Sequence, residues 1–151
     1  MRLTLQTDYA LRMLIYLAVN RNRSSRVADV AESYGISHNH LLKVALRLGK
    51  LGYVTTLRGR TGGISLAHRP EDINLGEVVR QMEDDFALVE CMRLDGGGCA
   101  ISPACKLNGL FSDALKAFLS VFDSHTLAYI TGNRAALLGL LSIDKNSPAA
   151  A

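Results

Sequence analysis

The sequence predicts a mainly α-helical protein with a small β wing, built as a winged helix-turn-helix domain followed by a long dimerisation helix. Three observations predict this fold class. Two short helical segments meet at a glycine, two β-prone segments flank a turn rich in arginine and glycine, and a long amphipathic segment lies near the C-terminus. The length of 151 residues suits one compact domain with an additional helical arm.

The N-terminal third predicts three helices. The first is expected over residues 4–20, where aliphatic side chains recur at helical spacing. After a polar linker, residues 27–35 predict a small amphipathic helix that ends at Gly35, a residue free to adopt positive φ. Ser37 is a good N-cap for a third helix over residues 38–52. Two helices joined by a tight glycine turn are typical of a helix-turn-helix, whose second helix enters the DNA major groove.

Residues 53–67 predict a strand, a turn and a second strand, because β-branched and aromatic residues flank a glycine-rich turn. Arg58 and Arg60 lie at the tip of this turn. A helix-turn-helix followed by such a hairpin is a winged helix. Two exposed arginines on a wing suit DNA phosphates or the narrow minor groove. An ordinary solvated hairpin is the alternative.

Charge is divided unevenly along the chain. Residues 1–63 carry ten Lys or Arg and three acids, a balance of +7, whereas residues 64–151 carry seven and eleven, a balance of −4. The basic half favours a nucleic-acid partner. The first turn of a recognition helix reaches base edges, and Asn can bond adenine through two atoms. The candidate base contacts are therefore His38, Asn39 and His40, and the candidate phosphate contacts are Ser37, Lys43, Arg47 and Lys50, with Arg58 and Arg60 on the wing.

The C-terminal half predicts further helices. Residues 73–85 form one, and residues 103–123 form a long one with apolar residues at three- and four-residue steps. An apolar stripe of this kind on a terminal helix needs a packing partner. In a dimer that binds palindromic DNA, the same helix of the second subunit is that partner. Packing against the subunit's own core is the alternative, and different faces can serve both. A short helix is expected over residues 124–133 and a disordered tail over residues 144–151.

All three cysteines, Cys91, Cys99 and Cys105, lie in one loop with glycines at 96–98. Three thiolates can hold zinc or an iron–sulfur cluster, or they can be unrelated. Zinc prefers a C-x-x-C pair, which is lacking, whereas clusters tolerate wider spacing. Glycines let a loop wrap closely around a bulky cofactor.

Cellular location is also constrained. An odd cysteine count argues against a structural disulfide, and the N-terminus shows no signal-peptide pattern. No apolar stretch reaches the roughly 18 residues of a membrane span. We therefore expect a cytoplasmic protein without a membrane partner.

Several motifs resemble one family. The opening MRLTLQTDYALRMLIYLA, the segment ISHNHLLKV, the turn RGRTGG and the cysteine loop with its long helix are similar to the winged-helix iron–sulfur regulators, the family of IscR, RirA and NsrR. The resemblance covers residues 1–141 and is greatest to the NsrR-like nitric-oxide-sensing repressors. It implies a homodimer, not an enzyme, with one iron–sulfur cluster per subunit (4Fe–4S, with 2Fe–2S open). Nitrosylation of the cluster would release palindromic promoter DNA and derepress nitric oxide detoxification genes.

The resemblance also implies a ligand set. Asn108 stands where IscR-like proteins carry a histidine ligand, so that ligand is absent. NsrR-like proteins can use an aspartate near the N-terminus from the other subunit, and Asp8 stands in the matching place, so the resemblance implies that the three cysteines of one subunit and Asp8 of the partner subunit hold the cluster. The alternative for Asp8 is an ion pair with Arg12, one helical turn away. Glu90, Asp95 and a small molecule stay open as fourth ligands.

The expected organisation is a winged helix-turn-helix domain over residues 1–83, a cluster-binding loop over 84–106, a dimerisation helix with C-terminal helices over 107–143, and a tail over 144–151.

An iron- or cluster-status regulator like RirA or IscR is the nearest alternative function, and it predicts DNA release on iron starvation. An enzyme or electron carrier is less favoured, because the chain lacks a nucleotide-binding glycine motif and a catalytic constellation. A metal-free DNA binder with a thiol switch predicts a colourless protein.

Overall fold

The computed structural model describes residues 2–57, 62–93 and 95–141. Helices α1 (Leu5–Val19), α2 (Val27–Tyr34) and α3 (His38–Lys50) are followed by strands β1 (Val54–Leu57) and β2 (Gly63–Leu66) and then by helices α4 (Leu75–Met82), α5 (Leu107–Asp123), α6 (Leu127–Ile130) and α7 (Arg134–Leu140). Short 3-10 helices lie at η1 (Pro70–Asp72), η2 (Glu90–Met92) and η3 (Ser102–Ala104). The expected fold class, mainly helical with a small β wing, is confirmed.

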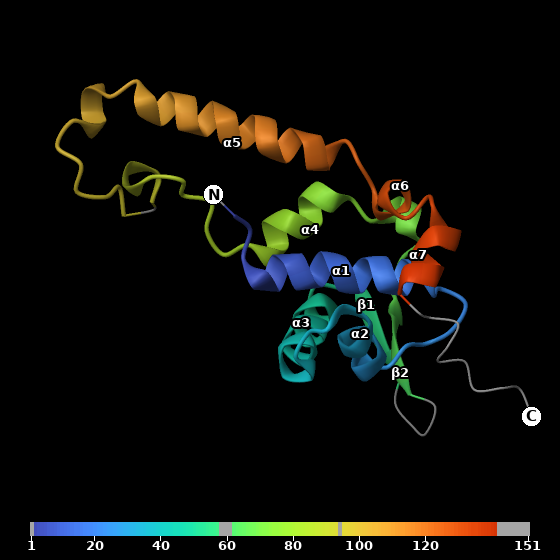
Figure 1. Ribbon diagram of the computed structural model, residues 1–151. Helices are drawn as coiled ribbons and strands as arrows, with labels where there is room; N and C mark the ends of the chain where they lie inside the picture. Colours follow the sequence, from blue (N-terminus) through green and yellow to red (C-terminus); the bar gives the residue numbers. More distant parts are fainter. Residues whose placement is uncertain (1, 58–61, 94, 142–151) are drawn as a thin grey trace, which may run out of the picture.

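Helix α1 runs through the centre of the core, with α2, α3 and the hairpin on one side and α4 on the other (Figure 1). Its residues Ala10, Met13 and Leu14 are fully buried. They belong to one apolar cluster with Leu41 of α3 and Val78 of α4. Because α1 is buried on both sides, it connects α2 and α3 to the C-terminal half.

The start of α1 is tied to the end of α4. Thr4 is the N-cap of α1, and its side chain accepts a hydrogen bond from the backbone N–H of Thr7. The backbone N–H of Thr4 donates to Glu83 Oε1 at 2.7 Å. Glu83 is only 9% exposed, so this carboxylate is satisfied by a specific contact rather than by water.

Helices α2 and α3 form the predicted helix-turn-helix. Gly35 ends α2 with φ +62°, a conformation that L side chains rarely adopt. Ser37 occupies the N-cap position of α3, as predicted, but its side chain makes no capping hydrogen bond.

Strands β1 and β2 pair antiparallel, with Val54 opposite Leu66 and Leu57 opposite Gly63. Ser25 exchanges two backbone hydrogen bonds with Ile64, at 2.9 and 2.8 Å, and so extends the sheet by a short bridge. A Cβ atom on Gly63 would lie 2.7 Å from the Ser25 carbonyl oxygen, so only glycine fits. The tip of the wing, with Arg58 and Arg60, lies outside the described residues.

Helix α5 and the segment between α4 and α5 form an arm that projects from the body (Figure 1). The prediction that this helix begins at residue 103 is wrong, because α5 begins at Leu107. Pro103 lies instead in the single 3-10 turn η3, and the extended backbone of Cys105 (ψ 115°) ends that turn. The ends of the helices expected over 73–85 and 124–133 are also trimmed, to α4 and α6.

Candidate functional site

Helix α3 presents the predicted base-contacting residues on its outer side. Leu41, Val44 and Leu48 are buried and fix the orientation of the helix, so its opposite face is exposed. Ser37, His38, Asn39, His40 and Lys43 are all exposed. Within the part of the chain that the structure describes, the side chains of Asn39 and Lys43 make no hydrogen bond or ion pair, so they are available to a ligand.

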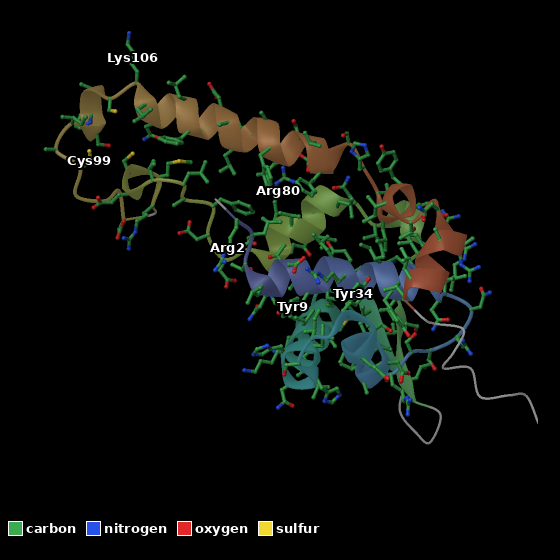
Figure 2. All side chains as sticks on the ribbon, in the orientation of Figure 1. Arg2, Tyr9, Tyr34, Arg80, Cys99 and Lys106 are labelled. Carbon is green, nitrogen blue, oxygen red and sulfur yellow. The ribbon has the colours of Figure 1, made fainter. Side chains whose placement is uncertain are left out.

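His40 differs from its neighbours because its ring stacks on Tyr9 of α1, with ring centroids 6.5 Å apart and an interplanar angle of 27°. Figure 2 labels Tyr9 on the side of α1 that faces the helix-turn-helix. His40 therefore has a contact with α1 in addition to any contact with DNA.

Arg47 has partners that the sequence did not reveal. Its guanidinium donates to Gln6 Oε1 at 3.0 Å, to the Gln81 carbonyl oxygen at 2.9 Å and to Asp84 Oδ1 at 2.8 Å. These three acceptors come from α1, α4 and the segment that leads into the cysteine loop. Arg47 thus joins α3 to the base of the arm, and its contact with a DNA phosphate stays a prediction. Lys50 is exposed at the end of α3.

Asp8 lies in the first turn of α1 and pairs with Arg12, with Nη2 and Oδ2 2.8 Å apart and Nε and Oδ1 3.0 Å apart. The Asp8–Arg12 pairing that the sequence offered as an alternative is therefore present in the single chain. The Arg12 guanidinium also lies 5.9 Å from the ring centroid of Tyr34 in α2. Burial raises the pKa of Tyr34 to about 12, although Arg12 acts in the opposite direction. Asp8 is about two-fifths exposed, at 39%, so a second group could reach it.

The cysteine loop is shaped by carboxylates that bind glycine amides. Glu90 Oε1 accepts a hydrogen bond from the N–H of Gly98 at 3.0 Å, and Asp95 Oδ1 accepts one from Gly97 at 3.1 Å. Gly97 has φ +59°, and a Cβ there would lie 2.6 Å from the Glu90 carbonyl oxygen. Both carboxylates therefore have a structural role in the loop.

The three cysteines are free thiols. Cys91 and Cys105 are half-buried, and Cys99 is exposed at the outer end of the arm (Figure 2). Across the described ranges, no three His, Cys, Asp or Glu side chains converge as a metal-ion site. A single metal ion needs ligands that converge on one point, whereas the thiolates that hold an iron–sulfur cluster surround a larger core. As a donor set, three soft thiols on a turned glycine loop fit an iron–sulfur cluster.

Comparison with known proteins decides the family. Residues 3–133 match Rrf2, described as an iron-dependent transcriptional regulator. The chain belongs to the Rrf2 family. It is 51% identical over 144 residues to the HTH-type transcriptional regulator NsrR of Bacillus subtilis, which covers 95% of this chain and 99% of that protein. It is 52% identical over 143 residues to the NsrR regulator of Bacillus licheniformis, covering 94% of this chain and 100% of that protein.

Solved Rrf2-type structures share the fold. T. potens IscR superposes with a TM-score of 0.71 at 23% identity, covering 88% of each chain. CymR, the global cysteine regulator of B. subtilis, gives a TM-score of 0.71 at 25% identity, covering 88% of this chain and 98% of that chain. This Rrf2 protein is therefore a DNA-binding transcriptional regulator of winged-helix fold. None of its described helices is long and apolar enough to cross a membrane.

Proposed function

We propose that this Rrf2 protein is a homodimeric repressor that holds an iron–sulfur cluster in its cysteine loop and releases promoter DNA in response to nitric oxide. The observation that carries the proposal is the set of three free thiols in one loop, in a chain half identical to NsrR regulators over almost its whole length. The loop lies on an arm, away from the DNA-binding helices, as a sensing element can (Figure 1).

Cys91, Cys99 and Cys105 would hold one cluster per subunit, 4Fe–4S by resemblance with 2Fe–2S as the other possibility. The fourth ligand would be Asp8 of the partner subunit. Within one chain, α1 starts at the base of the arm while Cys99 lies at its outer end (Figure 2), which favours a ligand from the second subunit. The bound cluster would supply iron that coordinates nitric oxide.

Helix α5 supports the homodimer. None of its side chains is fully buried within the chain. Leu107, Leu110 and Val121 are 53%, 67% and 60% exposed, and with the exposed Ala114 and Ala117 they recur at alternating three- and four-residue steps. This is the spacing of a two-helix seam. Phe111, Leu115, Phe118 and Phe122 line a groove against the segment before the cysteine loop, and Ala114 borders both this groove and the seam.

The neighbours of Asp8 contact both helices of the helix-turn-helix. Tyr9 stacks on His40 of α3, and Arg12 lies over Tyr34 of α2. If Asp8 becomes a ligand, its ion pair with Arg12 is perturbed, because both of its carboxylate oxygens contact the Arg12 guanidinium in the single chain. A change at Asp8 therefore alters contacts of the elements that bind DNA, which gives the signal a physical route.

A nitric oxide titration tests the proposal. The protein is purified without oxygen, and visible absorbance and binding to a palindromic promoter fragment are followed together. We expect absorbance to bleach and DNA binding to fall at the same few equivalents. Cys99→Ser and Asp8→Ala should lower cluster content or its lifetime in the same preparation. A protein that is colourless when purified anaerobically, or an Asp8→Ala variant with unchanged cluster stability and nitric oxide response, would contradict it.

A second candidate is an iron-status regulator that uses the same residues. It is favoured by the family description, which names iron dependence. It predicts that iron chelation abolishes DNA binding, while nitric oxide leaves DNA binding intact. The same titration, run in parallel with a chelator, separates the two.

A further inference from the structure

The recognition helix carries two exposed leucines that no fold requirement explains. Leu42 is 39% exposed and Leu46 is 67% exposed, although α3 otherwise buries its leucines completely. They are four residues apart and so lie on one face of the helix. Together with Val54 and Thr56 of β1 they line a shallow groove of about 450 Å³ between the helix and the hairpin. We name the pair Leu42 and Leu46 the leucine strip.

We propose that the leucine strip reads thymine methyl groups in the major groove of the operator. Thymine is the one DNA base with a methyl group on its major-groove edge, and apolar side chains recognise it by contact. The inference rests on the proposed function in one respect, that α3 is the helix that reads the operator. It adds a hydrophobic component to the polar contacts expected from Asn39.

The position of the strip points to DNA rather than to a protein. Leu42 lies next to Lys43 and one turn after Asn39, so the strip continues the surface that carries the predicted base and phosphate contacts. Lys50 rims the same groove, one turn beyond Leu46. An apolar strip with two lysines beside it suits a major groove, where base edges lie between two rows of phosphates.

The size of the effect follows from the small area in contact. A buried methylene contributes about 0.8 kcal/mol, which corresponds to about fourfold in affinity. Each thymine methyl in contact with the strip should therefore contribute about fourfold. In a palindromic site the same methyl occurs once in each half-site, which gives about sixteenfold for the dimer.

The experiment uses the full-length protein, purified without oxygen, to select binding sites from a random duplex library. The selected duplex is then synthesised with deoxyuridine in place of thymidine at one symmetric pair of positions at a time, which removes only the methyl groups. We expect the wild type to lose affinity at one or two such pairs. Leu42→Ala and Leu46→Ala should bind the thymine duplex more weakly and no longer distinguish it from the uracil duplex. Both side chains are exposed, so both variants should keep the wild-type helical content.

Lys43→Ala is the matched control, since it should weaken binding to both duplexes and keep their ratio. The proposal is overturned if the wild type binds both duplexes equally, or if the leucine variants keep the full ratio; the strip would then be a site for a protein. If the library yields no enriched sequence in any state of the protein, the proposed function fails together with this inference. If a sequence is enriched but the methyl groups have no effect, only this inference fails.

Discussion

Arg47 is expected to contact a DNA phosphate, and the structure gives it three partners within the chain. The substitution Arg47→Ala separates the two roles. In the structure it removes hydrogen bonds to Gln6 and to the Gln81 carbonyl oxygen, together with an ion pair to Asp84. The Arg47 side chain is 30% exposed and that of Asp84 is 78% exposed, so the ion pair is largely screened by solvent.

The expected destabilisation follows from these interactions. Each hydrogen bond contributes about 0.5–1 kcal/mol at such a site, and an exposed ion pair contributes about 0.5 kcal/mol. The sum is about 2 kcal/mol, which lowers the melting temperature of a chain of this size by about 4–8 °C. Arg47→Lys should lose most of the same stability, because an ammonium cannot reproduce the fork that reaches three acceptors. Asp84→Ala should cost only about 0.5 kcal/mol.

Two assays are run on the same variants at one protein concentration. Thermal or urea unfolding reports stability, and the slope of log affinity against log salt reports phosphate binding. Lys43→Ala, on the same helix, should keep its stability within about 0.5 kcal/mol and reduce the slope by about 0.9 for each DNA phosphate that the lysine neutralises. Arg47→Ala should lower the stability and leave the salt slope unchanged. The reasoning is refuted if Arg47→Ala keeps the wild-type melting temperature and reduces the salt slope as Lys43→Ala does.

Three further predictions address the arm, the wing and the core. Leu110→Glu places a charge on the exposed seam of α5 and should convert the proposed dimer to a folded monomer, as measured by analytical ultracentrifugation. A dimer of unchanged affinity would exclude this seam. Gly63→Ala forces a methyl against the Ser25 carbonyl oxygen and should cost about 1–3 kcal/mol in urea unfolding, whereas Gly139→Ala, which meets open space, should be neutral or slightly stabilising. Because the pKa of Tyr34 is raised to about 12 in the folded state from an ordinary value of 10.0, the unfolded state ionises first, and stability should fall as pH rises from 10 towards 12. Tyr34→Phe should reduce that fall, and an unchanged alkaline profile would contradict the burial of this hydroxyl.

The parts of the fold that depend on local signals were predictable from sequence. Gly35 ends α2 in the left-handed conformation that its position suggested, and the β-prone segments pair as a hairpin. The start of α5 was not predictable, because Ser102 followed by Pro103 has the signature of a helix N-terminus. That signature is real, but it produces only the single 3-10 turn of η3. Whether a first turn continues into an α-helix depends on the residues that follow it. Here the extended backbone of Cys105 ends the turn.

The site was predictable to the extent that it is local. The confinement of the cysteines to one loop and the closeness of Asp8 to Arg12 can both be read from spacing, and the structure contains that ion pair. The partners of Arg47 are separated from it by 34 to 41 residues, so no local pattern indicates them. The same holds for Thr4 and Glu83, which are 79 residues apart. Contacts of this kind depend on how the helices pack, which only the folded structure shows.

These long-range contacts share one feature that bears on regulation. Thr4 binds Glu83 and Arg47 binds Gln81 and Asp84, so the first residues of α1 and the recognition helix are both attached to residues 81–84, where the chain leaves α4 for the cysteine loop. The two attachments differ in strength. Glu83 is 9% exposed and accepts from both the N–H and the hydroxyl of Thr4, whereas Asp84 is mostly in solvent. A displacement of the loop should therefore act on the Asp8 end of α1 through a buried contact and on α3 through the more exposed contacts of Arg47.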